Sequence, residues 1–167
     1  MFDLFSISQT VADAALQLGG SDIRWYKAIF CPYVRDNGKP CYDEERGTSY
    51  IECPLCGGEG VMYASPRTVR GIYTDNSNNY SPDGSGGFIR GEKSLSLPRD
   101  LDIRLLKERD SQNARRILRD KFELLGVGCR PDGSRVVREV LYLKQDPVIP
   151  TINSGEIFQT VQVANNY

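Results

Sequence analysis

The sequence predicts a mostly β protein in which a cysteine-rich insert near the start precedes a domain of about five strands. Two observations predict this class. Short runs of branched and aromatic residues alternate with turn residues over most of the chain. Four of the five cysteines fall within residues 31–60. The 167 residues are enough for one domain with a small appendage.

The N-terminal part is predicted to contain a helix and then a strand. Residues 1–22 are expected to form a helical arm, because apolar residues recur there every three or four positions. These residues are Ile7, Val11, Ala14, Ala15 and Leu18. Two glycines, at positions 19 and 20, end the pattern. Residues 23–64 are expected to form the next unit, an aromatic strand followed by a four-cysteine module.

The rest of the chain is predicted to be mostly strands. Residues 65–145 are expected to form the main β domain, in which residues 74–87 are turn-rich and predict an exposed loop or hairpin tip. Its strands are expected near residues 68–73, 88–97, 121–125 and 136–143. The charged residues 99–119 fit either a helix or an extended linker. Residues 146–167 are expected to form a C-terminal arm, with a last strand near 156–163 as the alternative.

Cys53 and Cys56 form the clearest candidate site in the sequence. Two cysteines three positions apart can bind one tetrahedral ion from a single tight turn. Gly57 and Gly58 follow directly. Glycines at these positions let the backbone adopt positive φ and aim N–H groups at thiolate sulfur. This pattern is typical of a zinc knuckle.

Cys31 and Cys41 are the candidate second pair, ten positions apart at the two feet of a loop. Residues 31–60 contain three prolines and five glycines and lack apolar periodicity, so a metal or a cross-link is expected to order them. Because the chain has no histidine, a complete site needs all four cysteines, or a carboxylate such as Asp43 or Glu52 in place of one. Four thiolates leave no open position, which favours structural zinc over catalytic zinc. Two disulfides or unligated thiols are the alternative.

Composition excludes several function classes. Without histidine the chain cannot form a Ser-His-Asp triad, a Cys-His dyad or a His-ligated metal site. A net charge of −1 lacks the whole-chain basic footprint of a nucleic-acid-binding protein. No signal peptide or membrane-spanning run is visible. Cys129 is interpreted as a lone buried or idle thiol, so no catalytic residue is predicted and an enzyme is not expected.

One basic run allows two interpretations. It contains Arg104, Lys107, Arg109, Arg115, Arg116 and Arg119. It could contact DNA phosphates or an acidic partner ring. The sequence favours a solvated helix face with internal ion pairs, because acidic residues interrupt and flank the run.

Two resemblances add to this reading. Residues 53–60 resemble the CxxCxGxG half-repeat of the zinc domain in DnaJ-type co-chaperones, which supports zinc. Most of the chain resembles tailed-phage neck proteins, especially head-closure (stopper) and related head–tail joining proteins. The residues that carry this second resemblance are Trp25, Tyr26 and Lys27, followed by residues 53–60, 68–72, 91–98, 119–122 and 140–143.

The second resemblance implies a small β-barrel with an N-terminal helix and an inserted zinc-ribbon-like module. It implies a structural virion protein of the bacteriophage neck, assembled in the host cytoplasm, with structural Zn²⁺ on the four cysteines. Such a protein forms a homo-oligomeric ring, a head–tail connector with no membrane partner. The ring joins the portal or adaptor protein to the tail tube or tail-terminator protein and helps retain packaged DNA. A cytoplasmic zinc-ribbon nucleic-acid-binding protein and a tail-terminator or baseplate structural protein are the alternatives.

Overall fold

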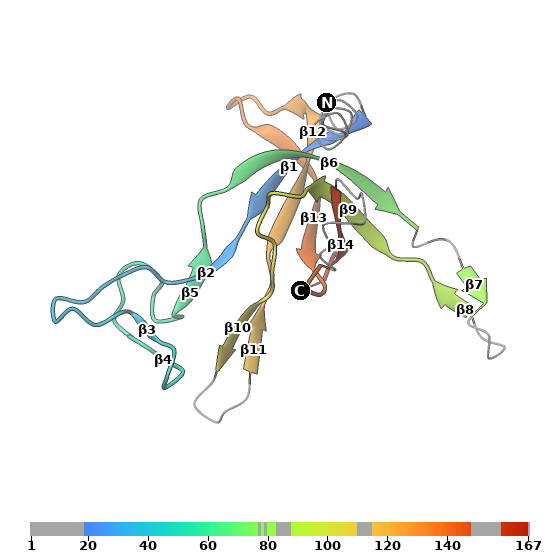
Figure 1. Cartoon of the computed structure of the whole chain (residues 1–167). Coiled ribbons are helices and arrows are strands. Elements are labelled where there is room, and N and C mark those ends of the chain that lie inside the picture. The colour runs from blue at the N-terminus through green and yellow to red at the C-terminus, as the bar shows by residue number, and fades with distance from the viewer. Residues whose placement is uncertain are drawn as a thin grey trace, which may run out of the picture.

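A computed structural model describes residues 19–76, 78, 80–82, 88–109, 115–147 and 158–166. Six of its strands form a closed barrel (Figure 1). They are β1 (Ser21–Tyr26), β6 (Arg67–Asp75), β9 (Lys93–Pro98), β12 (Lys121–Cys129), β13 (Arg135–Leu143) and β14 (Phe158–Ala164). The order around the barrel is β1-β12-β13-β14-β9-β6, and every neighbouring pair is antiparallel. Closure leaves these six strands without a free sheet edge.

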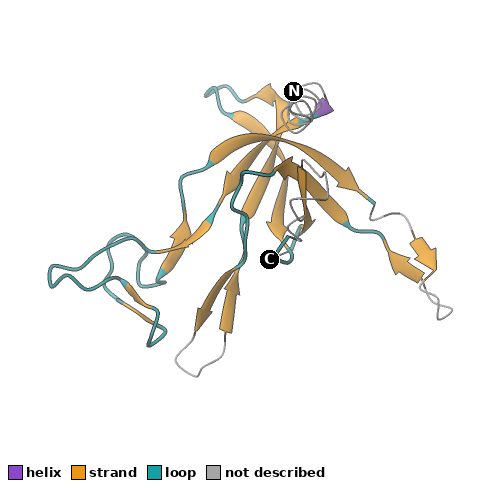
Figure 2. Cartoon of the chain, in the orientation of Figure 1, coloured by secondary structure: helices purple, strands orange, loops and turns teal. Residues whose placement is uncertain are grey.

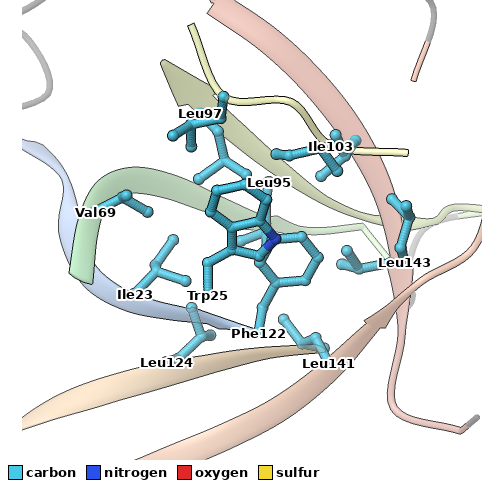
Figure 3. Close-up of a cluster of buried hydrophobic side chains, with 13 residues drawn as sticks. Ile23, Trp25, Val69, Leu95, Leu97, Ile103, Phe122, Leu124, Leu141 and Leu143 are labelled. Atoms are coloured by element: carbon cyan, nitrogen blue, oxygen red, sulfur yellow. The ribbon is translucent and has the colours of Figure 1, made fainter. Parts of the chain in front are cut away.

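Alternating side chains of these strands fill the barrel (Figure 3). In β1 the inward positions are Ile23 and Trp25, and Trp25 lies opposite Phe122 of β12. Leu101 and Ile103, from the segment after β9, are also buried in this core. The remaining buried members are Val69, Leu95, Leu97, Leu124, Leu141, Leu143, Val161 and Val163. Alternation of buried and more exposed residues is the signal by which the sequence specifies which face of a strand points inward; β12 departs from it where the register shifts at Leu124 and Leu125.

Gln159 is a buried polar side chain at one end of the barrel. Its Nε2 atom donates hydrogen bonds to the carbonyl oxygens of Pro98, at 2.8 Å, and Leu101, at 2.7 Å. The same two oxygens also accept hydrogen bonds from backbone N–H groups, Pro98 from Leu101 at 3.4 Å and Leu101 from Ile103 at 3.0 Å. Gln159 therefore joins the turn after β9 to β14.

Eight shorter strands form two-stranded sheets outside the barrel (Figures 1 and 2). They are β2 (Ala28–Phe30), β3 (Tyr42–Asp43), β4 (Thr48–Ser49), β5 (Val61–Tyr63), β7 (Tyr80–Pro82), β8 (Phe88–Arg90), β10 (Leu106–Arg109) and β11 (Arg115–Leu118). The pairs are β2 with β5, β3 with β4, β7 with β8, and β10 with β11. Three limbs project from the barrel: the cysteine module (residues 28–63), the β7–β8 hairpin and the β10–β11 hairpin.

The predicted mostly β class is confirmed, because the elements named in the described residues are all strands. Most of the helical arm predicted for residues 1–22 falls on residues 1–18, which lie outside the described part of the chain. Its last two residues belong to strand β1 and not to a helix. No helix in the described ranges is long and apolar enough to cross a membrane.

Three predictions about chain organisation need correction. Within residues 99–119, the described residues 106–109 and 115–118 pair as two antiparallel strands, where a helix or a linker was expected. The barrel is not confined to residues 65–145. β1 comes from the aromatic strand expected ahead of the cysteine module, and β14 corresponds to the alternative last strand near 156–163. Both strands were expected as strands, but their place in the barrel was not predicted, because their partners lie far away in the sequence, where a local pattern carries no information on pairing.

Candidate metal centre

The four predicted ligands converge in the cysteine module. The sulfur atoms of Cys31, Cys41, Cys53 and Cys56 all lie within 4.8 Å of one another. Sγ of Cys31 lies 3.7 Å from Sγ of Cys53, and Sγ of Cys41 lies 3.6 Å from Sγ of Cys56. A tetrahedral zinc ion with Zn–S bonds of about 2.3 Å has S–S edges of about 3.8 Å. The donor set therefore fits a tetrathiolate metal.

The two disulfides considered from the sequence are not formed. All four cysteines are free, and their sulfur atoms lie well beyond the S–S bond length of about 2.05 Å. The carboxylate alternatives are also outside the cluster. Asp43 accepts hydrogen bonds from the backbone N–H groups of Glu45 and Arg46, and Glu52 accepts one from the hydroxyl of Tyr50.

The first two cysteines are delivered by a short antiparallel frame. Cys31 directly follows β2, and its backbone N–H donates to the carbonyl of Gly60 at 2.9 Å. Cys41 donates to the carbonyl of Tyr33 at 2.8 Å, beside the bridge between Val34 and Pro40. The two cysteines thus lie at the feet of one loop, as expected. Each one also lies beside a cysteine of the knuckle, Cys31 beside Cys53 and Cys41 beside Cys56.

The knuckle depends on glycines at positions where a side chain does not fit. The backbone N–H of Gly60 donates to Sγ of Cys56 at 3.3 Å, as expected for a metal-binding turn. Gly60 has φ of +77°. A Cβ there would lie 2.8 Å from Cβ of Ser49 and 2.9 Å from Cδ2 of Tyr42. At Gly58, with φ of +94°, a Cβ would lie 2.7 Å from the carbonyl oxygen of Ile51.

The electrostatics of the cluster favour a bound cation. Burial raises the pKa of Cys31, and burial with the neighbouring thiols of Cys53 and Cys56 raises the pKa of Cys41 to about 12. Burial also acts on Cys53, but hydrogen bonds from the backbone of Cys56 and Leu55 and from the Cys41 and Cys56 thiols lower its pKa to about 6. The thiolate of Cys53 thus forms readily, while those of Cys31 and Cys41 need a nearby positive charge to form. A divalent metal supplies that charge and releases the protons.

Aromatic side chains surround the thiols. Phe30 and Tyr42 are stacked with their ring centroids 4.5 Å apart. Tyr33 and Tyr50 pack against the buried cysteines, and the guanidinium of Arg35 lies 4.4 Å from the ring centroid of Tyr50. Cys31, Cys41 and Cys53 are buried, which is typical of a structural site.

Asp120 connects the cysteine module to the barrel, and the sequence did not single it out for this role. Its carboxylate is fully buried and accepts hydrogen bonds from Nε1 of Trp25 at 2.8 Å and from the backbone N–H of Ala28 at 2.9 Å. Burial raises the pKa of Asp120 to about 6, although these hydrogen bonds and Lys27 act in the opposite direction. Trp25 belongs to the barrel core and Ala28 begins the module, so one side chain fixes both.

Lys121 of β12 makes a second contact, with two tyrosines at the base of the module. Nζ of Lys121 is 4.0 Å from the ring centroid of Tyr26 and 5.5 Å from that of Tyr63. The backbone N–H of Ala64 donates to the carbonyl of Lys27 at 2.8 Å, which joins the segments by which the chain enters and leaves the module. The cysteine module is therefore attached to the barrel by contacts of both Asp120 and Lys121. Cys129, by contrast, is exposed at the end of β12, outside the thiol cluster.

A tetrathiolate centre has no open coordination position, so it can hold the chain in place but cannot bind a substrate at the metal. In comparisons with known proteins, no family model and no curated protein matches the chain.

Proposed function

We propose that the protein is a structural component of a larger assembly, in which one zinc ion bound by Cys31, Cys41, Cys53 and Cys56 orders the cysteine module. The observation that carries this proposal is the convergence of four free thiols in a limb that has almost no aliphatic interior. Zinc fits because it takes four thiolates in tetrahedral geometry and has no redox chemistry of its own. Its role is to replace the missing core.

The proposed assembly is the neck of a tailed phage. In it the chain forms a ring that joins the portal or adaptor to the tail and helps retain packaged DNA. The sequence resemblance to head-closure proteins is the source of this assignment. The architecture supports it, because three limbs extend from a small barrel and offer surface to neighbouring subunits. Rings arise when each subunit makes the same head-to-tail contact around a cyclic axis.

The metal proposal is tested by elemental analysis of the purified protein. One zinc per chain is expected for the wild type and for Cys129→Ser, whose thiol is exposed and outside the cluster. Cys53→Ser and Cys56→Ser are expected to lose the metal. Replacing zinc with cobalt is expected to give the absorption of tetrahedral Co²⁺ thiolate. Metal-free wild-type protein, or equal metal content in all four proteins, would contradict the proposal.

The assembly proposal is tested by negative-stain electron microscopy and light scattering. Closed rings with a central channel are expected, either for the protein alone or on a portal ring. A monomer that binds duplex DNA with an affinity falling steeply with salt would identify the nucleic-acid-binding alternative instead.

A further inference from the structure

Tyr50 joins the two halves of the cysteine cluster through its backbone. Its N–H donates to the carbonyl of Cys41 at 2.8 Å, and its own carbonyl accepts from the N–H of Cys53 at 3.1 Å. Cys41 ends the loop that begins at Cys31, whereas Cys53 begins the knuckle. The position of Tyr50 therefore influences how the two cysteine pairs meet.

The side chain of Tyr50 contacts both the thiol cluster and Arg35. Its ring packs against the buried cysteines, and the guanidinium of Arg35 lies 4.4 Å from the centroid of that ring. A cation this close to an aromatic ring is attracted by the electron density of its face. Arg35 is therefore separated from the thiols by a single side chain.

A short turn places Arg35 on the side of its segment that faces the cluster. The backbone N–H of Arg35 donates to the carbonyl of Lys39 at 2.9 Å, and the N–H of Gly38 donates to the carbonyl of Arg35 at 2.9 Å. Successive side chains of an extended segment point to opposite sides. Tyr33 packs against the cysteines and Val34 is 58% exposed, so Arg35 returns to the side of Tyr33.

Nε of Arg35 is an orphaned polar atom. Among the residues that the structure describes, it is the buried side-chain nitrogen or oxygen that lacks a hydrogen-bond partner. A guanidinium keeps its charge at any ordinary pH, and a buried charged donor without an acceptor costs free energy. That cost is reduced where the surroundings are anionic. A zinc ion with four thiolates has a net charge of −2, so the proposed metal centre provides such surroundings.

We propose that Arg35 is a positioning residue of the zinc centre. Its guanidinium balances the negative charge of the metal–thiolate cluster and holds the ring of Tyr50 against the cysteines. The inference rests on the proposed zinc centre and adds to it a residue outside the four ligands. Three of those ligands are buried, and a buried net charge is costly unless a group of opposite charge lies nearby. Side chains that surround metal ligands commonly change metal affinity by about 10–100-fold.

The alternative is that Arg35 only covers Tyr50 with its carbon stem. Arginine stems often cover apolar surface in this way while the charged group contributes nothing. Two substitutions separate the roles. Arg35→Met keeps an unbranched apolar side chain and removes the charge, whereas Arg35→Lys keeps the charge and removes the planar guanidinium.

The experiment measures metal binding by the full-length protein and its variants. Zinc affinity is measured by competition with a chromophoric chelator at one pH and one salt concentration, and absorption spectra are recorded with Co²⁺ in place of zinc. The control is Arg46→Met, which removes the same charge from the same module. Arg46 is 80% exposed and pairs with Asp43 at 3.8 Å. Fluorescence of Trp25, which lies in the barrel core, verifies that the barrel of every variant is folded.

Arg35→Met is expected to bind zinc at least tenfold more weakly than wild type. Its thiolate-to-cobalt charge-transfer band is expected to move to longer wavelength, because a cation near the sulfur atoms lowers the energy of their filled orbitals. The d–d bands of tetrahedral Co²⁺ are expected to stay in place. Arg35→Lys is expected to lose no more than about threefold in zinc affinity, and Arg46→Met is expected to match wild type within about twofold.

Three outcomes would overturn the inference. They are an Arg35→Met variant that binds zinc as tightly as wild type, a charge-transfer band that does not move, and an Arg35→Lys variant that binds as weakly as Arg35→Met. If Arg35→Met binds no metal at all, retention of zinc by Arg35→Lys supports the charge role, and loss of zinc there contradicts it. A wild type without zinc would refute the proposed metal centre and this inference together. A wild type with one zinc ion and unaffected variants would refute only the role of Arg35.

Discussion

Asp120 gives the sharpest prediction, because its charge is buried where the barrel meets the cysteine module. Burial raises its pKa from the ordinary value of 3.8 to about 6. The folded protein thus binds this proton more tightly than the unfolded chain. The stability contributed by protonation is fully present below pH 4 and is lost as the pH rises through 6. Each tenfold change in the protonation equilibrium is worth about 1.4 kcal/mol, so the total is about 3 kcal/mol.

The perturbation is Asp120→Asn, which keeps the shape of the side chain and removes its titration. The amide oxygen can accept only one of the two hydrogen bonds from Trp25 and Ala28 cleanly, which costs about 1–3 kcal/mol at every pH. The free energy of unfolding of the wild type minus that of the variant is expected to fall by about 2–3 kcal/mol between pH 4 and pH 7.

The assay is urea unfolding followed by the fluorescence of Trp25, the single tryptophan, at several pH values and one zinc concentration. The contribution of thiol protonation to the free energy of unfolding is then the same in both proteins and cancels when one value is subtracted from the other. Asp132→Asn is the control with the opposite sign, because hydrogen bonds from Ser134 lower the pKa of Asp132. The wild-type-minus-control difference is expected to rise with pH. A flat or rising curve for Asp120→Asn would refute the reasoning, since it would mean that hydrogen bonding outweighs burial at this site.

Three further predictions concern the barrel and its limb. Gly71→Ala is expected to destabilise the fold by about 1–3 kcal/mol in urea unfolding, because the new Cβ would lie 2.7 Å from side-chain atoms of both Ile23 and Leu97. Gly128→Ala, whose Cβ would meet nothing closer than 3.9 Å, is its matched control and should stay within about 0.5 kcal/mol of wild type. Gln159→Leu is expected to cost about 1–3 kcal/mol in the same assay by removing the two hydrogen bonds that its amide donates to the carbonyl oxygens of Pro98 and Leu101; wild-type stability would show that the backbone donors Leu101 and Ile103 satisfy these oxygens alone. Chelation of zinc is expected to remove hydrogen-exchange protection from the cysteine module and leave the barrel strands protected, because the two buried clusters are separate; simultaneous loss in both would show one cooperative unit.

The sequence was most informative where chemistry and spacing are local. Cys53 and Cys56 with their glycines form a single turn, so their pattern alone predicts the geometry that the structure shows. Cys31 and Cys41 could be predicted as the other two ligands because the chain has no histidine and few other ligands lie nearby in the sequence. Asp43 and Glu52 were reasonable alternatives by type, but both side chains are used in local hydrogen bonds and lie outside the thiol cluster.

The sequence was least informative where strands pair over long distances. Trp25 lies opposite Phe122, and Gln159 lies opposite Leu97. No local pattern records such pairings. The segment after β9 was ambiguous for a related reason. Its apolar residues Leu101 and Ile103 belong to the barrel core, while Ile117 lies on the hairpin. The spacing of apolar residues in this segment therefore does not follow the period of any single helix or strand. The role of Asp120 was hidden because its burial depends on β1 and β12 meeting.

The place of β14 in the barrel sets an order of events during synthesis. This strand lies between β13 and β9 and begins only at residue 158. Until a ribosome has made it, both of those strands keep one unpaired edge, which is a template for pairing with other chains. The cysteine module is complete by residue 63, so it can take up its metal while most of the barrel is still being translated. A nascent chain at this stage therefore has a complete cysteine module attached to a barrel that is not yet closed. Translational pausing before residue 158 would prolong its exposure to aggregation.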